Sequence, residues 1–85
     1  MQVVLYTTAD PCPLCVDAWL QLDDLRERLG FRLETVDVES DPALFRLHRD
    51  RVPVVVVDGR EVAFGRLDPV ALEAVLVGGR VEGGA

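Results

Sequence analysis

The first half of the chain combines short apolar runs with one long amphipathic stretch. Residues 2–6 (Gln-Val-Val-Leu-Tyr) are almost continuously apolar, which is typical of a strand buried on both faces of a parallel sheet. After a turn-rich segment, apolar residues recur at intervals of three and four positions, the pattern of one helix face: Cys15, Ala18, Leu22, Leu25 and Leu29. Gly30 then stands where helices commonly end in a left-handed residue. Residues 32–38 alternate in polarity and predict a second strand.

In the second half, proline and glycine mark the boundaries of the elements. Asp41-Pro42 combines an N-cap residue with a proline at the first helical position, which predicts a short helix over residues 42–49. The apolar run 54–57 is separated from residues 60–64 by Asp58-Gly59. This pattern predicts two strands joined by a two-residue type I′ turn.

The C-terminal stretch predicts a last helix and a tail. Asp68-Pro69 repeats the cap-and-proline arrangement and opens a helix over residues 69–77, which we expect Gly78-Gly79 to stop. The domain is therefore expected to span residues 1–79. The glycine-rich residues 80–85 are expected to form a flexible tail.

The predicted order of elements is β-α-β-α-β-β-α, an α/β class. The β-α-β unit at the start requires a right-handed crossover, which makes its two strands parallel. The later hairpin adds two antiparallel strands. The sequence thus predicts a four-stranded mixed sheet with helices on both faces.

Composition narrows the classes of partner. The chain has 85 residues, of which 49% are hydrophobic, and a formal net charge of −6. An acidic domain is a poor match for nucleic acid or an anionic membrane surface, because both are bound mainly through Lys and Arg. No apolar run approaches the roughly 20 residues of a membrane helix, and we see no export signal. We therefore expect a cytoplasmic monomer that binds neither nucleic acid nor membrane.

The candidate chemistry lies in Cys12-Pro13-Leu14-Cys15, between the first strand and the first helix. Pro13 belongs at the first helical position, which makes Cys12 the N-cap, where the helix dipole and unpaired N–H groups stabilise a thiolate. Cys15 falls one turn later on the core-facing stripe and is expected to be less exposed. We therefore assign Cys12 as the attacking nucleophile and Cys15 as the resolving thiol of a thiol–disulfide oxidoreductase.

Other uses of the two cysteines stay open. Two cysteines and one histidine are too few for a closed structural zinc site in one chain, so we expect no metal in the monomer. Two chains would be able to pool four cysteines around zinc or an iron–sulfur cluster, which makes a dimeric binding module one alternative. A non-catalytic redox sensor, in which oxidation of the pair changes a partner surface, is another. Two ordinary buried cysteines would explain neither the flanking prolines nor the start of the helix.

Two further features of the sequence have more than one interpretation. Val52-Pro53 marks either a simple strand boundary or a cis proline beside the cysteines that exposes the backbone of Val52 to an extended substrate. His48 lies near the end of a short helix, where a favourable partner for the helix dipole is a simpler interpretation than a catalytic base.

The chain resembles the glutaredoxins of the thioredoxin superfamily from about residue 2 to residue 77. It is most similar to the small bacterial glutaredoxin-like proteins with a Cys-x-Leu-Cys site. The motifs fall in glutaredoxin order: Leu5-Tyr6-Thr7, Cys12-Pro13-Leu14-Cys15, Val52-Pro53-Val54, Asp58-Gly59 and Gly65 followed by Asp68. The resemblance implies a thioredoxin fold and a cis Pro53 that faces the dithiol.

The resemblance also implies a substrate groove between the Cys12 loop, Val52 and the stretch after the fourth strand. That groove would take glutathione or a peptide disulfide, so we expect Gly65 to take part in substrate binding. Asp68 matches the acidic position that binds the glutathione amino group in the family, and it is equally well explained as the N-cap of the last helix. Apart from the resemblance, Arg51 and Arg66 would either supply positive charge at the rim or be ordinary solvated surface arginines.

The implied activity is a dithiol cycle that reduces disulfide-containing proteins or small disulfides. No bound cofactor is expected, and electrons would come from glutathione or from a reductase. Three positions depart from the family pattern: Asp10 replaces a basic residue, Leu14 an aromatic residue and Phe64 the first of two glycines. Asp10 would oppose ionisation of Cys12.

Overall fold

The computed structural model describes residues 1–8 and 12–84, and side chains up to residue 78. These residues form a sheet with three α-helices and one short 3-10 helix, η1. In chain order the elements are β1 Gln2–Thr7, α1 Pro13–Leu29, β2 Arg32–Asp37, η1 Val38–Ser40, α2 Pro42–His48, β3 Val54–Val57, β4 Arg60–Phe64 and α3 Pro69–Gly84.

The sheet has four strands in the order β2-β1-β3-β4. β1 pairs with β2 in parallel and with β3 antiparallel, and β3 pairs with β4 antiparallel. The mixed sheet and the β-α-β-α-β-β-α order are therefore as the sequence predicted. η1 is an addition, in which the Asp37 side chain caps the turn by accepting the Glu39 N–H at 2.8 Å.

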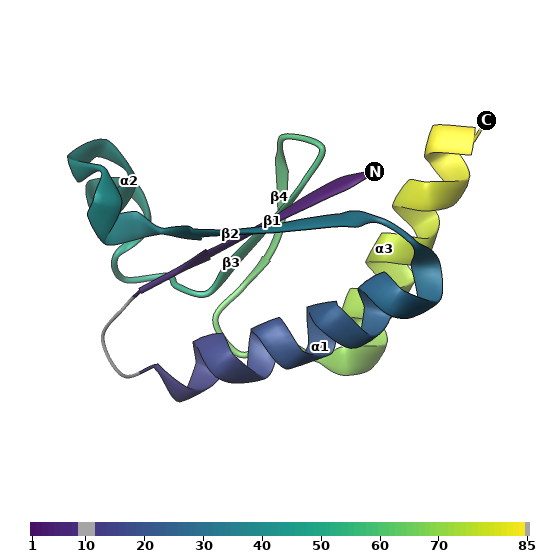
Figure 1. Cartoon of the computed structure of the whole chain (residues 1–85), viewed down its shortest axis with the longest axis horizontal. Coiled ribbons are helices and arrows are strands. Elements are labelled where there is room, and N and C mark those ends of the chain that lie inside the picture. The colour runs from purple at the N-terminus through teal and green to yellow at the C-terminus, as the bar shows by residue number, and fades with distance from the viewer. Residues whose placement is uncertain (9–11, 85) are drawn as a thin grey trace.

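Helices cover both faces of the sheet, but unequally. α1 and α3 lie together on one face (Figure 1), where they pack against Val3, Leu5 and Val55 in the main core. Tyr6 points to the other face because neighbouring side chains of a strand alternate. Its ring stacks on His48 at the end of α2, with ring centroids 4.7 Å apart. α2 therefore closes the opposite face at the end of β1.

The turns behave as their sequence predicts. Gly30 ends α1 in the left-handed conformation, at φ 75°, and its N–H donates to the Arg26 carbonyl at 2.8 Å. Asp41 caps α2 through its side chain, which accepts the Ala43 N–H at 2.8 Å. Asp58 and Gly59 both have positive φ, at 47° and 85°, as a type I′ turn requires.

The end of α3 was predicted wrongly. The helix continues through Gly78-Gly79 to Gly84 instead of stopping at residue 77. Glycine stops a helix when it adopts positive φ, and Gly78 does not. In a helical conformation glycine costs only about 0.5–1 kcal/mol relative to alanine. Whether residues 80–85 move independently of the domain stays a prediction.

β4 contains a β-bulge that the sequence pattern did not reveal. Val55 pairs with Ala63 but Val56 pairs with Glu61, so Val62 is the extra residue. A bulge shifts the alternation of side chains along its strand. Val62 and Ala63 are consecutive, yet both pack against the main core.

Across the described part of the chain, no helix is long and apolar enough to cross a membrane.

A matched pair of glycine substitutions tests the two helix ends. Gly30→Ala should lower the free energy of unfolding by about 1 kcal/mol, because alanine is disfavoured at positive φ. Gly78→Ala should raise it by about 0.5–1 kcal/mol, because the added methyl group meets no other part of the described structure within 4 Å and favours helix. Urea unfolding followed by circular dichroism measures both. A loss of stability in Gly78→Ala would show that the helix ends near residue 78.

Candidate active site

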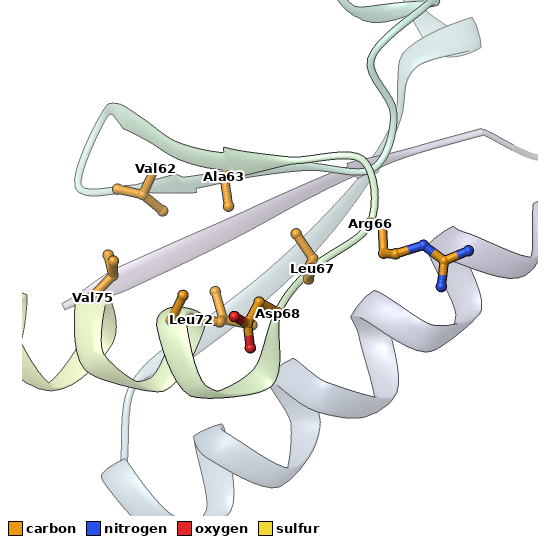
Figure 2. Close-up of a pocket in the computed structure, with 8 residues that line it drawn as sticks. Val62, Ala63, Arg66, Leu67, Asp68, Leu72 and Val75 are labelled. Carbon is orange, nitrogen blue, oxygen red and sulfur yellow. The ribbon is translucent and has the colours of Figure 1, made fainter.

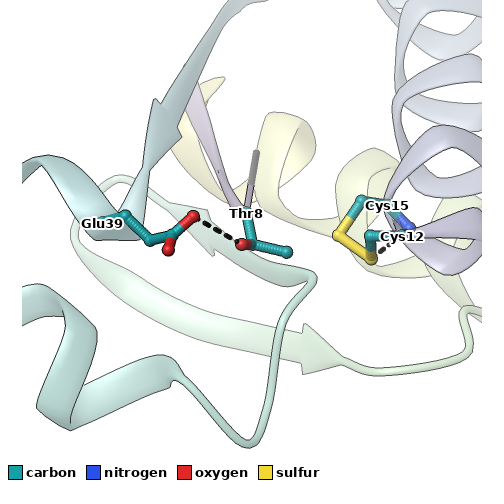
Figure 3. Close-up of a disulfide and its surroundings, with 4 residues drawn as sticks. All are labelled: Thr8, Cys12, Cys15 and Glu39. Carbon is teal, nitrogen blue, oxygen red and sulfur yellow. Dashed lines mark hydrogen bonds between the residues drawn. A yellow bond between two sulfur atoms is a disulfide. The ribbon is translucent and has the colours of Figure 1, made fainter. Parts of the chain in front are cut away.

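The two cysteines lie at the start of α1 and are joined as a disulfide, with Cα atoms 5.2 Å apart (Figure 3). Cys12 is the N-cap residue and Pro13 follows it in the first turn, as predicted. The Cys12 carbonyl accepts the N–H groups of Cys15 and Val16 at 3.0 and 3.1 Å. The Cys12 Sγ also accepts the Cys15 N–H, at 3.1 Å. The first helical turn thus directs a backbone donor at the sulfur of Cys12.

The two sulfur-bearing residues differ in exposure, in the order predicted. Cys15 is 5% exposed and stands on the same helix face as the core residue Ala18. Cys12 is half-buried at the helix end. An incoming molecule therefore meets Cys12 first.

The pairing of the strands places the other predicted residues at the end of the sheet from which the chain leads into α1. Tyr6, near the end of β1, pairs with Val54 at the start of β3, and Val54 pairs with Phe64 at the end of β4. Val52 and Pro53 therefore enter the sheet where β1 leaves it for the cysteine loop. The Val52–Pro53 bond is cis, the isomer that the resemblance implied.

Pro53 and Gly65 are directly connected. Gly65 has φ 71° and donates its N–H to the Pro53 carbonyl at 2.8 Å. Pro53 is fully buried, whereas Val52 is half-buried. The two segments named as the sides of a substrate groove thus lie together, although their roles in binding stay predictions.

Arg51 and Asp68 both have partners within the chain. The Arg51 guanidinium forms an ion pair with Glu61 and lies 4.4 Å from the centroid of the Phe64 ring. The Asp68 carboxylate accepts the Val70 N–H at 3.0 Å at the start of α3. The geometry therefore supports the capping interpretation of Asp68, whose side chain is nevertheless exposed.

A small apolar cavity of about 80 Å³ lies between β4 and α3 (Figure 2). Its walls include Val62, Leu67 and Leu72, and Asp68 stands at its rim. Arg66 also lines it, with a side chain that extends toward α1 in Figure 2. Neither cysteine lines this cavity, so it is distinct from the disulfide.

Among the described residues, one acidic side chain, Glu39, is linked to the strand that leads into the cysteine loop. Thr8, the last described residue before the cysteine loop, donates from its hydroxyl to the Glu39 carboxylate at 3.1 Å (Figure 3). Asp10, expected to oppose ionisation of Cys12, lies outside the described residues. In the part of the chain that the structure describes, no group of three or more His, Cys, Asp or Glu side chains is arranged to hold a metal ion.

A family model for the glutaredoxin-like domain (DUF836) matches residues 2–77. The chain belongs to this glutaredoxin-like family. An uncharacterized protein of Mycobacterium tuberculosis and one of Mycobacterium bovis are each 40% identical to it over 78 residues. The match covers 86% of this chain and 79% of either relative.

Solved structures place the glutaredoxin-like chain in the thioredoxin fold. An X-ray structure of a structural genomics target from X. campestris is 32% identical, covers 89% of this chain and 96% of its own, and has a TM-score of 0.75. A solution structure of a protein from Nitrosomonas europaea is 29% identical, and the match covers 87% of this chain and 88% of that one, with a TM-score of 0.73. A thioredoxin mutant from Halobacterium salinarum is 25% identical, and the match covers 87% of this chain and 69% of that one, with a TM-score of 0.65.

His48 has a larger structural role in this glutaredoxin-like domain than the sequence suggested. It is 6% exposed, and its ring stacks on Tyr6 at an interplanar angle of 26°. Its carbonyl accepts the N–H groups of Arg51 and Val52 at 2.8 and 3.1 Å. His48 thereby links the end of β1 to the segment that leads into Pro53. Its buried Nδ1 has no hydrogen-bond partner among the described residues.

Two substitutions at His48 separate stacking from polarity. His48→Ala should lower the free energy of unfolding by about 2 kcal/mol or more, because it removes a buried ring and leaves a cavity. His48→Phe should keep stability within about 1 kcal/mol of the wild type, because it retains the ring and removes an unpaired buried nitrogen. Thermal and urea unfolding measure both. A phenylalanine variant as unstable as the alanine variant would contradict a role for ring stacking.

Proposed function

We propose that this glutaredoxin-like protein is a thiol–disulfide oxidoreductase that works by a dithiol cycle. The observation that carries the proposal is the pairing of Cys12 and Cys15 at disulfide distance, at the first turn of α1 in a thioredoxin fold. Its substrates are disulfide-containing proteins or small disulfides. The setting is the cytoplasm, where glutathione or a reductase keeps such dithiols reduced.

The cycle begins with both cysteines reduced. The Cys12 thiolate attacks one sulfur of the substrate disulfide, forms a mixed disulfide and releases the other sulfur as a thiolate that takes up a proton. Cys15, as its thiolate, then attacks the Cys12 sulfur of the mixed disulfide. The second substrate thiol leaves, and the Cys12–Cys15 disulfide remains. Two electrons have passed from the protein to the substrate, and glutathione or a reductase must return them.

The positions of the sulfurs support this division of roles. In the reduced state, the Cys15 N–H and the positive end of α1 would favour the thiolate form of Cys12. Cys15 is buried and adjacent, so it is protected from outside disulfides but close enough to resolve the intermediate. One chain supplies both sulfurs, so a monomer suffices for the cycle.

Single cysteine substitutions test the assignment. The reduced Cys15→Ser variant should accumulate one covalent adduct on Cys12 when mixed with excess hydroxyethyl disulfide, because no resolving thiol remains. Intact-protein mass spectrometry with and without dithiothreitol measures the adduct. The reduced Cys12→Ser variant is the matched control and should accumulate far less. The opposite result would reverse the two roles.

The source of electrons is tested by coupled turnover. The wild type is supplied with hydroxyethyl disulfide and with either glutathione and glutathione reductase or thioredoxin reductase, each with NADPH. Consumption of NADPH that depends on Cys12 should appear in at least one of the two systems. No turnover in either, from a protein whose cysteines are readily oxidised by peroxide, would instead support a redox sensor.

A further inference from the structure

Arg51, Glu61 and Phe64 form a cluster beside the segment that carries Val52 and Pro53. The Arg51 guanidinium is paired with the Glu61 carboxylate and lies 4.4 Å from the Phe64 ring centroid. The side chains of Arg51 and Glu61 are 38% and 33% exposed, and Phe64 is 53% exposed. The cluster is thus half-buried at the surface and within reach of a bound molecule.

The β-bulge in β4 creates this cluster. In a regular strand, Glu61 and Phe64 would point to opposite faces of the sheet, because they are an odd number of residues apart. The extra residue Val62 brings both side chains to the same face, where Glu61 is paired with Val56 and Phe64 with Val54. Arg51 approaches that face from the end of α2 and contacts both side chains.

Arg51 and Phe64 lie at the end of the sheet from which the chain leads into the cysteine loop. Phe64 precedes Gly65, whose N–H is bonded to the Pro53 carbonyl at 2.8 Å. The register of Val54 with Tyr6 places Pro53 beside the end of β1, which leads into the cysteine loop. A disulfide substrate held against Cys12 and the Pro53 segment would therefore lie at the end of the sheet where Arg51 stands, two residues before Pro53.

The ion pair removes most of the charge that Arg51 would otherwise present. A guanidinium and a carboxylate in contact have no net charge, so their combined field falls off quickly with distance. The ring of Phe64 covers one face of the guanidinium and holds it in place. The protein also has a formal net charge of −6, so little positive charge remains to attract an anion.

We propose that Glu61 is a specificity-determining residue of the dithiol site: it occupies Arg51 and so selects neutral disulfides over anionic ones. This inference rests on the proposed oxidoreductase function and adds the charge class of the substrate. Glutathione disulfide, which is anionic, is then a poorer substrate than a neutral disulfide of similar reactivity.

The test compares two small disulfides of similar size on the reduced full-length protein. Hydroxyethyl disulfide is neutral and dithiodipropionate carries two carboxylates. The rate constant of each reaction is measured by quenching it and counting the remaining protein thiols, so no reductase is needed.

Glu61→Gln frees the Arg51 guanidinium. It should raise the ratio of the rate constant for the anionic disulfide to that for the neutral disulfide by about two- to fivefold, the range expected for a half-exposed charge pair. The gain should shrink in high salt.

Glu73→Gln is the control for total charge, because it removes the same charge from a half-exposed ion pair on another part of the surface, where Arg28 keeps Asp24 as a second partner at 3.0 Å. Glu73 pairs with Arg28 at 2.9 Å, with side chains 46% and 50% exposed. Arg28 lies about 24 Å from Cys12 along α1, at about 1.5 Å per residue, well beyond the screening length of about 8 Å in physiological salt. Glu73→Gln should leave the ratio unchanged. An equal gain in both variants would mean that only total charge matters, which would overturn the proposal.

A double variant shows whether the gain passes through Arg51. In an Arg51→Gln background, Glu61→Gln should lose most of its effect on the ratio. The inference would be overturned by an undiminished gain in the Arg51→Gln background, or by no gain in Glu61→Gln alone, in a protein that still reacts with the neutral disulfide. Failure of the wild type to react with the neutral disulfide through Cys12 would instead overturn the oxidoreductase function. The two failures are therefore distinguishable.

Discussion

β1 is paired along both of its edges, with β2 in parallel and with β3 antiparallel, and the site depends on this double pairing. The register of Tyr6 with Val54 determines where the chain leaves the sheet toward the cysteines and where Pro53 enters it. Val3 and Leu5, on the same strand, are fully buried under α1 and α3. A slip of one residue would turn these two side chains away from α1 and α3 and bring the residues beside them into their place, so the hydrophobic core itself holds the site in register.

Local signals in the sequence predicted most of the fold and both sulfurs of the site. Asp41, Asp58 and Gly30 each act within a few residues of their own position, and each does in the structure what its sequence context predicted. Cys12 is a similar case, because Pro13 alone was enough to place it at the N-cap. The end of α3 escaped prediction because glycine is permissive and stops a helix only where its φ is positive, which sequence alone does not reveal at Gly78.

The parts of the site that sequence could not predict depend on contacts between distant segments. His48 was placed at a helix end, but only the packing of α2 brings its ring onto Tyr6. The cluster of Arg51, Glu61 and Phe64 depends on one unpaired residue in β4, and a pattern of alternating polarity in a five-residue strand does not identify a bulge. The departure of Phe64 from the glutaredoxin pattern was visible in sequence, but its partner was not.

The segment that carries Val52 and Pro53 is held from both sides, and this explains why its charge environment is fixed. On the β1 side, the His48 carbonyl binds the N–H groups of Arg51 and Val52. On the β4 side, Gly65 binds the Pro53 carbonyl, and Arg51 is anchored by Glu61 and Phe64. The Arg51 side chain still loses rotamer freedom when it pairs, but the ion pair with Glu61 and the contact with the Phe64 ring share that cost. The contacts that hold the backbone beside Pro53 thus also keep the guanidinium next to Glu61, and this is the charge arrangement on which the proposed selectivity rests.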